Sequence, residues 1–115
     1  MSHKIYSMPF IKIYTALLAK VEKKGRTKDD LHQVIFWLTG YDDSTFATLL
    51  SKDTTLEVFF TNAPAFNPNA KLITGTICGC RVEEIEDELM WRIRCLDKLV
   101  DELAKGKAME KILRM

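Results

Sequence analysis

The chain has 115 residues, of which 47% are apolar and 29% charged, the balance of a soluble globular protein of one domain, 1–115. Its 17 Lys and Arg residues against 16 Asp and Glu residues give a net charge of +1, without the basic excess typical of nucleic-acid-binding proteins. The sequence contains neither an apolar run long enough for a membrane span nor an N-terminal signal peptide, so we expect a cytoplasmic protein.

Apolar residues recur at helical spacing in the first part of the chain and predict helices over 8–24 and 28–39. In the first helix, the apolar positions from Phe10 onwards fall on a single face. Gly25 and Gly40 are expected to end the two helices, because glycine adopts the left-handed conformation at a helix C-terminus without steric cost.

Two shorter helices are predicted next. The stretch "YDDSTFATLL" offers acidic and hydroxyl N-caps ahead of Phe46, which predicts a helix of about two turns. In "TTLE", Thr54 and Glu57 have the spacing of a capping box, which predicts a further helix that ends before Pro64.

The segment 68–78 has conflicting signals. Asn67 as N-cap and Pro68 as the first helical residue favour a helix. Gly75 and the β-branched residues around it favour a strand instead. We interpret the segment as a helix, because a lone strand would have no evident partner elsewhere in the chain.

A long helix is predicted from Val82 to Lys105, where apolar residues step by three or four positions. Its start is crowded with the carboxylates of 83–88, which suit the positive end of a helix dipole. Gly106 should end it, and a short helix through Met109 can follow. The fold class is therefore all-α, a compact bundle of about five to seven helices with one long C-terminal helix.

Cys78 and Cys80 are separated by a single residue, a spacing that could indicate a metal or redox site. The other cysteine and histidine residues are Cys95, His3 and His32, which stand singly along the chain and do not have a known zinc spacing. A disulfide between such close neighbours is geometrically awkward. We therefore expect no metal, cofactor or catalytic residue here, and interpret Gly79 as the point where two helices meet.

A helix-turn-helix reading of "HQVIFWLTGYDDSTFATLL" offers DNA binding as an alternative function, with Gly40 in the turn. Bulky Phe36 stands where the two helices would need a small residue. Asp42 and Asp43 open the would-be recognition helix and would repel phosphate. An ordinary pair of antiparallel helices is the better interpretation, and no nucleic-acid partner is expected.

Several blocks of the sequence resemble a family of small bacterial proteins known as domain of unknown function, family 2200. The blocks are "MPF", "KKGRTKDD", "WLTGYDD", "NPNAKLITGTICG" and "LDKLVDELAKGKAMEKIL", and they extend over essentially the whole chain. The resemblance implies a compact stand-alone protein. It implies no activity, ligand or catalytic residue.

The aromatic residues exceed what one apolar face per short helix can bury, which favours a non-enzymatic protein that acts through contacts. The candidate interface residues are Trp91, Trp37 and Tyr41. In a continuous helix Trp91 lies about 200° from the core-facing Ile93, so we expect it near the rim, at the interface of a homodimer or with another protein. Alternatively, Trp91 folds back on the terminal helix and the protein is monomeric.

A small-molecule binder or enzyme is the competing class of function. It would have a pocket between helices, lined by Trp37, Tyr41, His32 and Cys78. His32 lies beside Leu31 on the predicted second helix, and a boundary position is a simpler explanation for it than a catalytic one.

Overall fold

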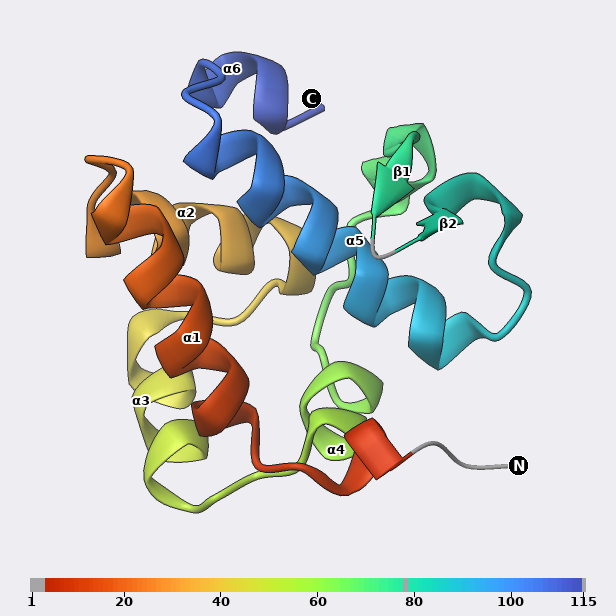
Figure 1. The fold of residues 1–115 in the computed structure, drawn as a ribbon. Helices are drawn as coiled ribbons and strands as arrows, with labels where there is room; N and C mark the ends of the chain where they lie inside the picture. The colour runs from red at the N-terminus through yellow and green to blue at the C-terminus, as the bar shows by residue number, and fades with distance from the viewer. Residues whose placement is uncertain (1–3, 78, 115) are drawn as a thin grey trace.

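The computed structural model describes residues 4–77 and 79–114, which form an all-α fold with a small β-hairpin (Figure 1). The α-helices are α1 (Phe10–Lys23), α2 (Lys28–Thr39), α3 (Asp43–Ser51), α4 (Leu56–Thr61), α5 (Glu88–Ala104) and α6 (Met109–Ile112). The 3₁₀ turns are η1 (Lys4–Ser7), η2 (Pro68–Leu72) and η3 (Val82–Glu84), and the strands are β1 (Thr76–Ile77) and β2 (Cys80–Arg81). The prediction of a helical bundle with a long C-terminal helix is confirmed.

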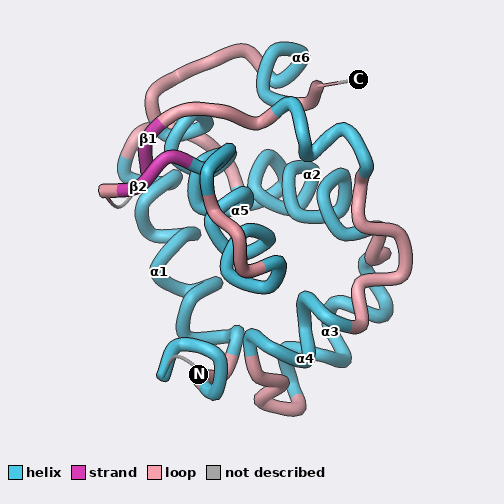
Figure 2. Tube along the Cα trace, turned by 90° about the vertical axis from the view of Figure 1, so that its right-hand side faces the viewer, coloured by secondary structure: helices cyan, strands magenta, loops and turns pink. Residues whose placement is uncertain are grey.

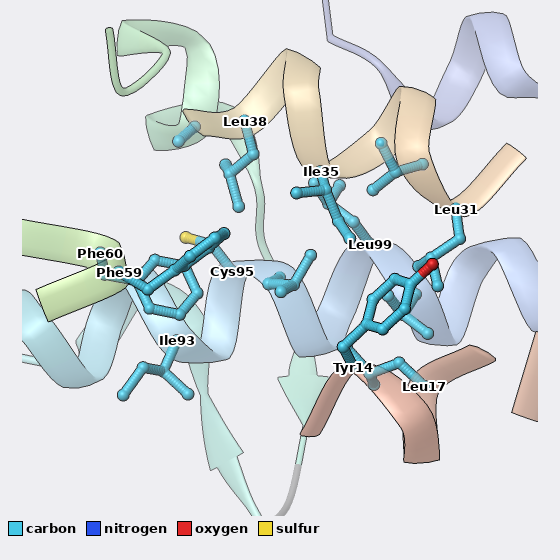
Figure 3. Close-up of a cluster of buried hydrophobic side chains, with 14 of the residues drawn as sticks. Tyr14, Leu17, Leu31, Ile35, Leu38, Phe59, Phe60, Ile93, Cys95 and Leu99 are labelled. Atoms are coloured by element: carbon cyan, nitrogen blue, oxygen red, sulfur yellow. The ribbon is translucent and has the colours of Figure 1, made fainter. Parts of the chain in front are cut away.

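Helix α5 is the centre of the molecule. It packs against α1, α2, α4, α6 and the hairpin, and Figure 2 shows it surrounded by these elements. Its buried residues Ile93, Cys95 and Leu99 meet Ile35 of α2 and Phe59 of α4 in the core (Figure 3). None of the described helices is both long and apolar enough to cross a membrane.

The predicted bounds of α2 are confirmed, because both of its caps are specific, whereas α1 begins at Phe10 and ends at Lys23, inside its predicted range of 8–24. Thr27 and Asp30 form a reciprocal capping box at the start of α2, and Gly40 ends that helix in the left-handed conformation with φ of 83°. Helix α4 begins one residue later than predicted. Its cap is Thr55, whose hydroxyl accepts from the backbone N–H of Val58, so the capping box that begins at Thr54 is wrong.

The helix predicted over 68–78 is also wrong. Asn67 and Pro68 do start a helical turn, but this 3₁₀ turn ends at Leu72 and β1 follows. The strand's partner is the next segment of chain, β2, with Ile77 opposite Cys80. A helix cannot pass through Gly75, whose φ is 111°, so the β-branched residues after it take the extended conformation that they prefer.

The long helix starts at Glu88, six residues later than its predicted start at Val82. The carboxylate of Asp87 accepts from the backbone N–H of Met90 and caps the helix there. Val82 is buried through η3, and Ile85 is in an extended conformation. Their spacing matches the helical period although they are not in the helix. Of the carboxylates of 83–88, Glu83 and Glu84 lie in η3, Glu86 and Asp87 lie between η3 and α5, and Glu88 alone is in the helix.

Candidate functional site

A groove lies where η2, the loop after the hairpin and the first turns of α5 come together. Its volume is about 340 Å³. We call it the Trp91 groove, and its lining residues are Lys71, Ile73, Glu83, Ile85, Glu86, Glu88 and Trp91. A smaller hollow of about 140 Å³ shares Glu88 with it and continues along α5 to Arg92.

The side chain of Trp91 is held in place by an aromatic contact. Its ring lies 5.6 Å from the ring of Phe66, centroid to centroid, and is half-buried. Phe66 is fixed in turn by Arg92, whose guanidinium lies 4.4 Å from the ring centroid while its Nη1 donates to the carbonyl of Phe60 at 2.7 Å. Ile73 is buried and Ile85 half-buried, and with Trp91 they form the apolar part of the groove's lining.

The charged residues of the groove differ in what they already bind. Glu83 accepts from the backbone N–H of Gly75 at 3.1 Å, and Glu88 pairs with Arg92 at 3.4 Å. Lys71 and Glu86 are exposed, and within 4–77 and 79–114 neither side chain makes a hydrogen bond or ion pair. The groove therefore offers one cation and one carboxylate to a partner.

The structure separates the three predicted interface residues. Trp91 lines the groove, whereas Trp37 is half-buried on α2 and does not. Tyr41 is only 6% exposed, and its hydroxyl donates to the carbonyl of Phe59 at 2.6 Å. Tyr41 is thus a core residue, and the expectation that it lies at a surface is corrected.

His32 lies in an aromatic cluster of α1, α2 and α3, with its Nε2 hydrogen-bonded to the hydroxyl of Tyr14. The rings of Phe36 and Phe46 lie 5.5 and 5.2 Å from it. Burial, and secondarily the charge of Lys28, lowers the pKa of His32 below its ordinary value of 6.5. None of these cluster residues lines the Trp91 groove. Cys78, the fourth residue of the predicted pocket with His32, Trp37 and Tyr41, lies outside the described residues, so that pocket stays a prediction.

The cysteine segment is a hairpin rather than a junction of two helices. Gly79 has a φ of 81°, the left-handed conformation that we expected, but it lies in the turn between β1 and β2. Cys80 is half-buried with a free thiol, and burial raises the pKa of the Cys95 thiol to about 12. Cys78 lies outside the described residues. The described part of the chain contains no cluster of three His, Cys, Asp or Glu residues that could hold a metal ion.

The α2–α3 pair keeps the features that argue against DNA binding. The rings of Phe36 and Phe46 meet edge to face at 5.3 Å between the two helices. The carboxylate of Asp42 caps α3 by accepting from the backbone N–H of Thr45 at 2.8 Å, and Asp43 is exposed in its first turn. The N-terminus of the would-be recognition helix is therefore acidic.

Comparison with known proteins identifies the family. The model of an uncharacterized protein family conserved in bacteria, DUF2200, matches residues 4–114, so the chain belongs to that family. The structure is similar to the crystal structure of uncharacterized protein SP1917, with 52% identity, a TM-score of 0.91 and coverage of 98% of this chain and 93% of that one. Comparison with curated proteins gives no match.

Only Trp91 among the residues of the groove was singled out from the sequence. Its position on the opposite side of the helix from the core-facing Ile93 indicated that it lies near the surface. The remaining lining residues were assigned to continuous helices, where Lys71 and Glu86 would have been part of a solvated face. A reading of Asp87 as an N-cap would have placed the acidic residues before it in a loop.

Proposed function

We propose that this is a cytoplasmic, non-enzymatic protein that acts through protein–protein contacts, and that the Trp91 groove is its contact site. The observation that carries the proposal is a half-buried tryptophan in a preformed groove of about 340 Å³. Tryptophan contributes strongly to binding where it fills or lines a pocket, because a partner's apolar side chain removes much of its ring from water. We expect the partner to be a second copy of the chain, in a symmetric dimer.

The rigidity of the groove supports this assignment. Trp91 lies against Phe66, and Arg92 connects Phe66 to the backbone of α4 through the Phe60 carbonyl. A partner would meet a tryptophan whose orientation is already set, so binding would require little loss of side-chain entropy.

A small-molecule ligand is the second candidate for the same site. The volume of the groove lies near the lower end of the range of about 300–1,000 Å³ found for ligand pockets. Its apolar lining beside carboxylates would suit an amphipathic organic cation. This alternative makes the protein a ligand-binding module.

Multi-angle light scattering of wild type, Trp91→Ala and Trp37→Ala tests the main proposal. Trp37 is the matched control, because it is also half-buried but is not part of the groove. We expect a dimer for wild type and Trp37→Ala at high micromolar concentration, and a monomer for Trp91→Ala with an unchanged circular dichroism spectrum. A monomeric wild type would contradict the dimer, and a dimeric Trp91→Ala would remove the groove from it.

The ligand-binding alternative makes a different prediction. Pools of cationic metabolites would raise the melting temperature of monomeric wild type but not that of Trp91→Ala, because a ligand that binds only the folded state stabilises it.

A further inference from the structure

We propose that the Trp91 groove is occupied by Leu72 of a second copy of the chain, with Lys71 of that copy facing Glu86. The inference rests on the proposed homodimer and names the residues that form it. In a two-fold dimer the same contact occurs twice, because each copy supplies both the projecting leucine and the groove.

Leu72 is an unusual surface residue. It is 59% exposed, against 43% for Val58 and 36% for Met8, the other exposed large apolar side chains among the described residues. An isolated exposed leucine is ordinary in a protein, but this one is placed between two residues of the groove, Lys71 and Ile73.

The backbone holds this leucine in a fixed position. It is the last residue of η2, a turn that begins with Pro68 and is capped by the side chain of Asn67, which accepts from the N–H of Asn69 at 2.9 Å. The turn is closed by a hydrogen bond from the N–H of Ile73 to the carbonyl of Ala70 at 3.0 Å. The leucine is thus presented by an ordered turn.

A projecting side chain next to a hollow makes a surface self-complementary. Leu72 cannot enter the groove of its own chain while its neighbours Lys71 and Ile73 form part of that groove's wall. A two-fold axis beside η2 would place each Leu72 over the other copy's Trp91, where the apolar residues Ile73 and Ile85 complete the contact.

The unpaired charges favour the same partner. Lys71 and Glu86 each have no ion pair within the described chain, whereas Glu83 and Glu88 are already engaged. In a second copy, Leu72 is next to Lys71, so the leucine can contact the apolar part of the groove while the lysine pairs with Glu86. Two Lys71–Glu86 pairs would form across the dimer and help to set its orientation.

The first experiment changes the leucine. By sedimentation velocity, Leu72→Asp should weaken dimerisation roughly a hundredfold or more, because two apolar contacts are lost and a carboxylate is placed near glutamates. Val58→Asp is the matched control, since Val58 is exposed and apolar but does not line the groove, and it should remain dimeric. A dimeric Leu72→Asp would overturn the inference.

The second experiment uses charge reversal. Lys71→Glu and Glu86→Lys should each dimerise more weakly than wild type, because each places like charges opposite one another in the homodimer. An equimolar mixture of the two variants should form heterodimers, seen by native mass spectrometry, because both contacts are then oppositely charged. Failure of the mixture to associate better than either variant alone would overturn the pairing.

The outcomes separate this inference from the proposed function. If Trp91→Ala dissociates the dimer but Leu72→Asp does not, the groove remains the contact site and only the role of Leu72 is overturned. A monomeric wild type would overturn both the dimer and the inference. If that monomer binds oligolysine and Glu86→Lys does not, the groove accepts a basic partner other than the chain itself.

Discussion

The ion pair between Glu102 and Arg114 fixes the C-terminal segment to α5, and we predict that breaking it is costly. Glu102 is only 8% exposed. Arg114 donates to both of its carboxylate oxygens at 2.8 Å, and also donates to the carbonyl of Ile112. Removing the guanidinium would leave a carboxylate buried without its bidentate partner.

The magnitude follows from what remains after the substitution. Breaking a buried ion pair by removing one partner costs about 3–5 kcal/mol. In Arg114→Met, Lys107 still lies 3.5 Å from Glu102 and can compensate in part, so we expect a loss near the lower end, about 3 kcal/mol. The double variant Arg114→Met/Glu102→Leu should recover to within about 1 kcal/mol of wild type, because no buried charge is left.

Urea denaturation followed by circular dichroism gives these free energies of unfolding. Lys105→Met is the matched control: Lys105 pairs with Asp101 at 3.0 Å, but its side chain is 72% exposed, and such pairs contribute about 0–1 kcal/mol. The reasoning would be refuted if Arg114→Met cost no more than Lys105→Met, or if the double variant were as unstable as the single one.

Three further predictions concern other parts of the fold. Gly40→Ala should destabilise the protein more than Gly25→Ala when the free energies of unfolding are measured by urea denaturation. Each substitution forces an alanine to positive φ, which costs about 1–2 kcal/mol of stability. At Gly40 the new Cβ would also lie 2.7 Å from the Cβ of Ala65, which adds a steric clash. In a variant with no other cysteine, Cys95 should react with Ellman's reagent only as fast as the protein unfolds, and rapid labelling of the native state would contradict its burial. By NMR, the pKa of His32 should lie below 6.5. Because the unfolded chain then binds the proton more tightly than the folded one, the free energy of unfolding should fall as pH drops from about 7 to about 5. The decrease should be smaller in His32→Gln.

The elements predicted well from the sequence are those whose ends carry specific chemistry. Thr27 and Asp30 at the start of α2 and Gly40 at its end determine that helix by local interactions, so no tertiary information was needed. The same applies to α3, where Asp42 is the cap.

The errors have a common physical cause. Segments 68–78 and 82–87 contain apolar residues at helical spacing, but Ile73 and Val82 are buried beside 3₁₀ turns that face α5, and Leu72 is exposed. Apolar periodicity reports which residues face the core and does not distinguish a helix from a turn that faces the same core. The decisive signals were Gly75 and Asp87, which were present in the sequence and were outweighed by the periodic pattern.

These errors concern the same segments that line the proposed contact site. Had 68–78 and 82–105 been continuous helices, Lys71 and Glu86 would lie on solvated helix faces and Trp91 on an open helix surface. The breaks at Gly75 and Asp87 instead bring residues of η2, η3 and the loop before α5 together with Trp91 in the lining of an open groove. Local structure is therefore interrupted at the groove that we propose as the contact site, and functional sites are where agreement between local propensity and fold is expected to be weakest. The exposed Leu72 belongs to the same irregular segment, so the projecting side chain and the groove arise from one feature of the chain.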